Sequence, residues 1–211
     1  MQFRHRAIAV AAAAGVALVP ALIGASSASA KPGSEPLAGV LLADTTKKGN
    51  PSFDDKGKDF DILTAAVLAV LDAKPNSAVS ILTDGNARLT AFLPTDGGFE
   101  RTGKALGITA HSEERLATKY VKTLGVDGLE SVLLYHVVAG VKINAAAAAD
   151  SDGAQLETAL GQNIRVNVTH DGIFIKDKAT DVANPKVIIV DINKGNKQIG
   201  HGINRVLLPK L

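Results

Sequence analysis

The chain has 211 residues, of which 46% are apolar, and it contains no cysteine and no tryptophan. Without disulfides it cannot be a cross-linked miniature, so Val, Ile, Leu and Ala must build a core of ordinary size. The 23 Lys and Arg residues outnumber the 21 Asp and Glu residues, but Arg4 and Arg6 belong to an N-terminal segment that we expect to be cleaved. The remainder is formally neutral, so no nucleic-acid partner is expected.

Residues 1–30 have the pattern of a secretory signal peptide. Two arginines give a positive start, an apolar run extends from Ala7 to Gly24, and Ala28-Ser29-Ala30 matches a small-residue cleavage site. An uncleaved membrane anchor is the alternative, because the run is nearly long enough to span a bilayer. The cleavage site favours removal, and the lack of cysteine excludes a bacterial lipid anchor. We therefore expect a secreted, extracellular protein without membrane insertion after cleavage.

Residues 31–52 are rich in proline, glycine, serine and lysine, which predicts a linker or a loosely held N-terminal arm. The apolar patch Leu37–Leu42 lies inside this arm and could either dock on the domain or remain mobile. Residues 53–211 are numerous enough to bury a core as one domain. We expect this domain to be a monomer.

The first half of the domain is predicted to be mainly helical. Residues from Asp59 to Ala73 place apolar side chains at helical spacing, with acidic residues at the positive end of the helix dipole. Thr95 and Asp96 predict a second, capped helix, and Ser112-Glu113-Glu114 predict a third that ends at Gly125. The shorter predicted elements are an apolar segment at 78–82, a strand at 88–93, a helical segment at 129–134, a strand at 135–138 and a weak helix at 143–149.

The second half is predicted to consist of strands, because the apolar period changes to two from Ala154 onward. A closing hairpin is expected to pair Val187–Val190 with Ile203–Leu208 across a turn at Gly195-Asn196, and Pro209 ends the pairing. The other predicted strands are 154–160, 163–168 and 173–176. Helices followed by strands predict an α+β fold.

Candidate chemistry is sparse. His136 and His201 lie in apolar strand contexts and could meet as a metal pair, but a buried imidazole that donates to a backbone carbonyl is the favoured interpretation. The chain has no nucleophile elbow and no glycine-rich phosphate loop, and adjacent pairs such as Glu113-Glu114 do not form an acid/base dyad. We therefore predict no catalytic residues, no metal site and no cofactor.

Three motifs together resemble the fasciclin (FAS1) domain family. Thr90–Phe99, with the sequence TAFLPTDGGF, resembles its first motif, and Leu133–Val138, LLYHVV, resembles its central Tyr-His motif. Gly200–Pro209, GHGINRVLLP, is similar to its closing motif, although His201 lies between two glycines where the family usually has branched residues. The resemblance covers about Phe53 to Leu211 and implies a β-sandwich-like wedge of two sheets with several helices packed along it.

The resemblance also implies which residues bind a partner. The family's contact segments match Tyr135 and His136, which we expect on opposite faces of a strand, and Asp191 and Ile192 before the closing motif. The alternative is that the aliphatic residues around them are buried and unavailable to any partner.

Three classes of function remain open. The resemblance implies a secreted adhesion or interaction module that binds a cell-surface or matrix protein or polysaccharide. A small-ligand carrier or sensor, with a pocket between the sheets and the helices, is the alternative. A hydrolase is disfavoured, because the motifs for such chemistry are missing.

Overall fold

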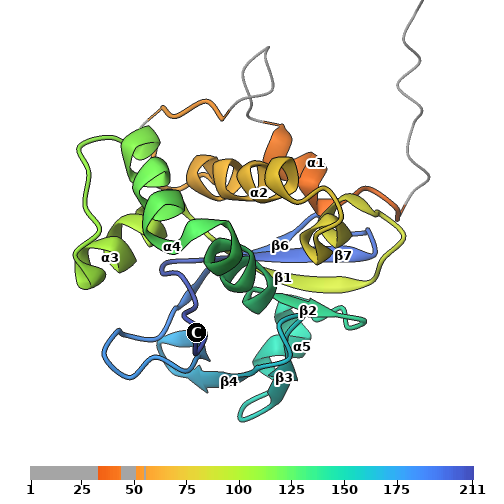
Figure 1. The fold of residues 1–211 in the computed structure, drawn as a ribbon. Helices are drawn as coiled ribbons and strands as arrows, with labels where there is room; N and C mark the ends of the chain where they lie inside the picture. Colours follow the sequence, from red (N-terminus) through yellow and green to blue (C-terminus); the bar gives the residue numbers. More distant parts are fainter. Residues whose placement is uncertain (1–32, 44–50, 55) are drawn as a thin grey trace, which may run out of the picture.

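The computed structural model describes residues 33–43, 51–54 and 56–211. The predicted signal peptide, residues 1–30, lies outside the described residues. Figure 1 shows helices packed along one sheet, with a second, smaller sheet on the side away from α2 and α4. Helices and sheets therefore occupy separate layers, which confirms the predicted α+β class with two sheets.

The helical layer comes mainly from the first half of the chain. Its elements are α1 (Leu37–Leu42), α2 (Asp61–Ala73), the 3-10 helix η1 (Ala78–Thr83), α3 (Asp96–Leu106) and α4 (Glu113–Tyr135), and a short helix α5 (Ala145–Ala149) follows later. Helix α4 bends at Gly125, whose φ of 65° and ψ of 174° are not helical. The two helical segments predicted on either side of Gly125 are thus two helices that meet at a sharp kink.

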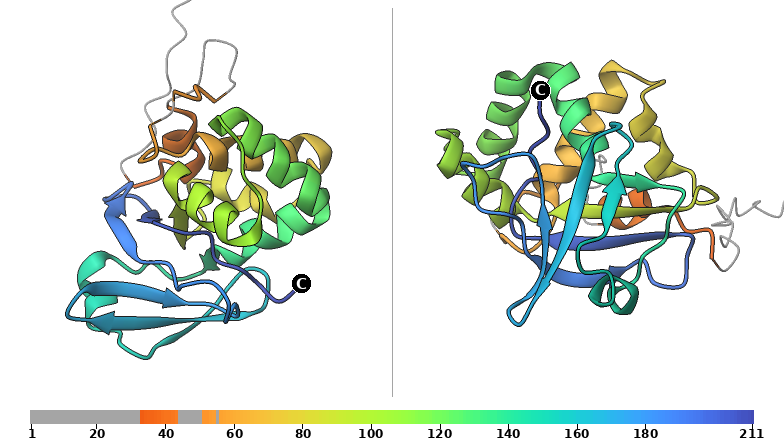
Figure 2. Two further views of the ribbon diagram at one scale, coloured as in Figure 1. Left: turned by 90° about the vertical axis from the view of Figure 1, so that its left-hand side faces the viewer. Right: turned by 90° about the horizontal axis from the view of Figure 1, so that it is seen from below.

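The larger sheet has the strand order β2-β1-β7-β6, and the smaller one has the order β3-β4-β5. The strands are β1 (Leu89–Pro94), β2 (Val137–Ala139), β3 (Gln155–Glu157), β4 (Asn163–Thr169), β5 (Gly172–Lys176), β6 (Val187–Ile192) and β7 (Gln198–Ile203). Strands β1 and β7 run parallel, and every other pair is antiparallel. Figure 2 shows the smaller sheet beneath the larger one, and a bridge between Phe174 and Lys186 joins the two.

The second strand of the closing hairpin was predicted at the wrong residues. The residues that pair are Gln198–Ile203, whereas Val206 and Leu207 are buried outside any strand. Two glycines weakened the strand pattern of this stretch, and packing explains why they are there. A Cβ atom on Gly200 would lie 2.8 Å from Leu93 Cδ1, and one on Gly202 would lie 2.9 Å from Ile189 Cβ. Neighbouring side chains fill the space that a larger residue would need.

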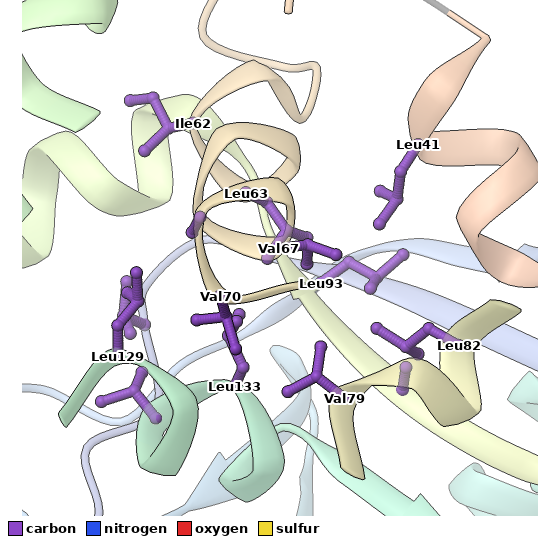
Figure 3. Close-up of a cluster of buried hydrophobic side chains, with 14 of the residues drawn as sticks. Leu41, Ile62, Leu63, Val67, Val70, Val79, Leu82, Leu93, Leu129 and Leu133 are labelled. Carbon is purple, nitrogen blue, oxygen red and sulfur yellow. The ribbon is translucent and has the colours of Figure 1, made fainter. Parts of the chain in front are cut away.

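The core has two parts, one on each side of the larger sheet. Ala91 and Leu93 of β1 face the helices and belong to the cluster shown in Figure 3, with Val70 of α2 and Leu133 of α4. Phe92 points the other way, as strand geometry requires. It joins a second cluster with residues of α4, β4, β5 and β7: Tyr135, Ile164, Val166, Ile175 and Ile203. Strand β1 is therefore buried on both faces.

Helix α1 docks on the domain. Leu37 is fully buried, and its N–H donates to Gln198 Oε1 at 2.7 Å. The amide nitrogen of Gln198 donates in turn to the carbonyl oxygens of Ile81 and Asp84, both at 2.8 Å. One buried glutamine of β7 thus joins α1 to the region of η1, so the apolar patch of the predicted arm is part of the packed structure.

The docking of α1 can be tested with two leucines of the same helix. Leu37→Ala should lower the free energy of unfolding by about 2–5 kcal/mol, because it leaves a cavity in the core. Leu42 is 41% exposed, so Leu42→Ala should cost less than about 1 kcal/mol. Both values come from urea titration. Equal, small losses would show that α1 is not held in solution.

Candidate functional site

Tyr135 and His136 lie at the end of helix α4, not on a strand. Tyr135 is the last helical residue, and His136 caps the helix with φ −88° and ψ −4°. The prediction that they occupy opposite faces of a strand is therefore wrong. The helix continues through this aromatic pair because its apolar side packs inward, and only from Val137 does the chain pair with β1. Both side chains are buried.

The imidazole of His136 bonds to the backbone on both sides. Its Nδ1 donates to the carbonyl oxygen of Val132 at 2.7 Å, and its Nε2 accepts the N–H of Leu207 at 2.9 Å. This pattern requires a neutral ring with the proton on Nδ1. Burial lowers the pKa of His136 to about 4, because the charged form would lose its hydration. The ring thus joins α4 to the closing segment, as expected for a structural histidine.

The hydroxyl of Tyr135 is also hydrogen-bonded to the backbone. Its hydroxyl donates to the carbonyl oxygen of Asn163 at 3.4 Å. Burial is the main reason why the pKa of Tyr135 rises to about 12, and the charge of Asp177 adds to it. Tyr135 therefore links α4 to the smaller sheet.

Asp191 and Ile192 lie at the end of β6. The carboxylate of Asp191 is 17% exposed, accepts the N–H of Ala145 at 2.8 Å and lies 3.6 Å from Lys194 Nζ. Asp191 has φ +58°, which is uncommon for a residue with a side chain. Ile192 is partly buried against the main core cluster. Asp191 thus holds the start of α5 beside the β6–β7 turn.

The structure brings Asp191 next to His201 and not next to His136. The Asp191 N–H donates to His201 Nδ1 at 3.4 Å, and His201 Nε2 donates to the carbonyl oxygen of Ile143 at 2.8 Å. Each of the two buried histidines therefore uses both ring nitrogens for backbone groups. No nitrogen is left for the metal pair that was the less favoured alternative.

The outer face of β6 is a surface that sequence reasoning missed. This strand lies at the edge of the larger sheet, and Ile188 and Val190 project from it with 46% and 51% of their surface exposed. The apolar run was predicted as a strand of the closing hairpin, and nothing local in it marks the strand as an edge. An exposed apolar edge strand is a ready site for contact with another protein.

An apolar cleft lies between helices α3 and α4 and the last residues of the chain. It is a cleft of about 320 Å³ with an almost entirely apolar lining, which includes Phe99, Leu106, Tyr120, Leu124, Val132 and Leu208. The rings of Phe99 and Tyr120 meet edge to face at 5.2 Å. The Tyr120 hydroxyl donates to the carbonyl oxygen of Phe99 at 2.7 Å, so it does not offer its proton to the cleft. The cleft can accept an apolar group of modest size.

One mixed sheet, one antiparallel sheet and a helical layer, with motif residues buried at their junctions, define an α+β domain. The model of the Fasciclin domain family matches residues 63–209, and the chain belongs to this family. The resemblance drawn from the three motifs is thereby confirmed. Fasciclin domains are generally extracellular, non-enzymatic modules that mediate adhesion through protein interactions.

A solved structure of a FAS1 domain pair from the insect cell adhesion molecule Fasciclin I is also similar to this chain. The two share 17% sequence identity with a TM-score of 0.49, and the match covers 74% of this chain and 49% of that one. The chain thus spans about half the length of that structure. Comparison with curated proteins gave no match.

The buried histidine predicts a pH dependence with a definite sign. The folded pKa of His136 is about 4 and the unfolded value is about 6.5. The stability that neutral His136 provides is therefore complete above about pH 6.5 and is lost as the pH falls towards about 4, by an amount on the order of 3 kcal/mol.

His136→Gln removes this titration together with the two ring hydrogen bonds. The variant should be less stable than the wild type at neutral pH, and the gap should narrow as the pH falls. Urea titrations at several pH values measure both. His170→Gln, in which the replaced side chain is 90% exposed, is the control and should run parallel to the wild type. A gap that stays constant with pH would contradict the buried neutral ring.

Proposed function

We propose that the protein is a secreted, monomeric adhesion module that binds a cell-surface or matrix partner through the outer face of β6. The observation that supports this proposal is the pair Ile188 and Val190, each about half exposed on an edge strand. Exposed apolar side chains on an edge strand suit a protein partner, which can add a strand of its own, better than a polysaccharide. A polysaccharide remains the other outcome of the test.

In this proposal the residues matched to the family's contact segments have two different roles. Asp191 and Ile192 extend the strand that carries the exposed pair, so Asp191 borders the binding face. Tyr135 and His136 act from inside, because their side chains are buried and bonded to the backbone. They would position the sheet and would not touch the partner.

In this proposal the protein is exported from the cell and acts by binding a partner, not by catalysing a reaction. The pattern of residues 1–30 supports cleavage after Ala30, which N-terminal sequencing of protein from the culture medium can check. Among the described residues, no helix combines the length and apolar character that a bilayer crossing requires. No cofactor and no nucleic acid has a part in this function.

Adsorption to intact cells of the producing organism, and to matrix proteins and polysaccharides, tests the binding face. The double variant Ile188→Lys/Val190→Glu removes the apolar pair without changing the net charge. It should bind at least about tenfold more weakly, since loss of a central apolar contact commonly costs more than 1 kcal/mol. Both positions are exposed, so stability should change little.

The matched control is Leu42→Lys/Val141→Glu, which replaces two residues of similar exposure, 41% and 45%, on other elements. It should bind like the wild type. If both double variants lose binding equally, the face of β6 is not the site. If the wild-type protein binds nothing above an unrelated control protein, the adhesion role is wrong.

A second candidate function is a carrier or sensor for a small apolar ligand, and the cleft of about 320 Å³ is the observation that favours it. This volume lies at the lower end of the range for ligand pockets. Native mass spectrometry of freshly purified protein would detect a ligand that remains bound.

Ala179 lines the cleft, so Ala179→Trp should fill part of it and weaken binding of an apolar fluorescent probe by about tenfold or more. Ala149→Trp, on the exposed side of α5, is the control and should leave probe binding unchanged. Equal binding by all three proteins, with no co-purified ligand, would exclude the carrier.

A further inference from the structure

Three acidic side chains meet where three helices begin. Asp59 precedes α2, Asp96 is the first residue of α3, and Glu113 is the first residue of α4. One carboxylate oxygen from each lies within 4.8 Å of the others. Asp96 and Glu113 are buried, so the carboxylates come together inside the fold and not on an open surface. Asp59 and Asp96 are 37 positions apart in the chain, Asp96 and Glu113 are 17 apart, and no sequence motif links all three.

Asp59 is the member of this cluster that needs an explanation. Both of its carboxylate oxygens expose less than 1 Å², and among the described residues no N–H and no hydroxyl group donates to them, so a hydrogen bond with the Asp96 carboxyl requires a shared proton. A buried carboxylate without a donor is costly, and such groups in native proteins usually mark an ion or a shared proton. The two oxygens of Asp59 therefore point to something that binds between the acids.

The backbone holds the cluster in place. The carboxylate of Asp96 accepts the N–H groups of Asp61 at 3.1 Å and Ile62 at 2.8 Å, which caps helix α2. The Asp96 N–H donates to the Asp59 carbonyl oxygen at 3.1 Å. These bonds fix Asp96 against the chain that carries Asp59, so the acids are preorganised before any ligand arrives. Preorganised oxygen ligands are what a cation site requires.

Two occupants could relieve the repulsion between these acids. The first is a proton, because burial raises the pKa of Asp96 to about 8, with a hydrogen bond to Asp59 as the next cause. The second is a metal ion. Asp59 also belongs to a second acidic group with Asp54 and Asp61. Asp54 is exposed and pairs with Lys56, so this second group connects the buried oxygens to the surface.

We propose that Asp59, Asp96 and Glu113 bind a calcium ion. The ligand set contains only carboxylate oxygens, which hard divalent cations prefer and zinc does not require. Oxygens that share a calcium ion at 2.3–2.6 Å lie up to about 5 Å apart, which accommodates the 4.8 Å limit of this cluster. Magnesium holds its ligands closer and in a stricter octahedron, so it fits less well. The bound ion would tie together the starts of α2, α3 and α4.

The test is thermal unfolding of the purified protein after EDTA treatment and removal of the chelator. Calcium chloride at about 10 mM should raise the Tm by about 5 °C, if the affinity is that of other extracellular calcium modules. Magnesium at the same concentration should raise it less. Isothermal titration with calcium should give one site per chain.

Asp59→Asn and Glu113→Gln remove one ligand each and should abolish the calcium response. Glu114→Gln is the matched control, because Glu114 is the exposed neighbour of Glu113 in the same first turn. It should respond like the wild type. A wild-type protein whose Tm and titration show no response to calcium overturns the proposal, whatever the variants do. A response that persists in both ligand variants overturns it as well.

A proton shared between Asp59 and Asp96 makes a different prediction. In that case Asp59→Asn would match or exceed the wild type in stability, and calcium would change neither Tm. This result would assign the cluster to a proton and overturn the calcium site.

Discussion

The structure depends on the insertion of β7 between β1 and β6. All six residues of this strand are buried, and its parallel pairing with β1 joins positions more than one hundred residues apart. Such contacts form only after a long loop has been closed, so the cost in chain entropy must be recovered by dense packing. Gly200 and Gly202 permit that packing, because Leu93 and Ile189 occupy the space beside them. The glycines that flank His201, unusual for the family, are therefore a feature of close strand packing and not a weakness of the fold.

The same strand explains why distant polar groups are buried at low cost. Gln198 bonds to α1 and to the carbonyls around η1, and His201 bonds to Ile143 and Asp191. His136 performs the equivalent task at the end of α4, where it accepts from Leu207. Each of these side chains satisfies backbone groups that neither helix nor sheet could pair, which is the usual requirement for burying them. The hydrogen-bonding atoms of these side chains bind backbone groups of the same chain, so they are not available to a partner.

Local patterns in the sequence predicted most of the helices and the strands of the smaller sheet. The period of the apolar residues located α2, and the cap residues Thr95 and Ser112 marked the starts of α3 and α4. Predictions failed where tertiary packing determines which secondary structure a segment adopts. Tyr135 and His136 have the sequence pattern of a strand but end a helix. The two glycines of β7 weakened the apolar pattern of a strand that is central in the sheet, so its bounds were predicted wrongly. The edge position of β6 and the meeting of Asp59, Asp96 and Glu113 could not be predicted, because both depend on how remote segments assemble.

The motifs that reveal the family are thus poor guides to the partner. Phe92, Phe99, Tyr135 and His136 carry the resemblance, and all of them are buried. Residues under such constraints specify the arrangement of helices and sheets, so related domains can share them while binding different molecules. In the proposed function, specificity comes from positions that the motifs leave unconstrained, such as Ile188 and Val190 on β6. Family membership supports the kind of function, whereas the identity of the partner depends on surfaces that the family pattern does not describe.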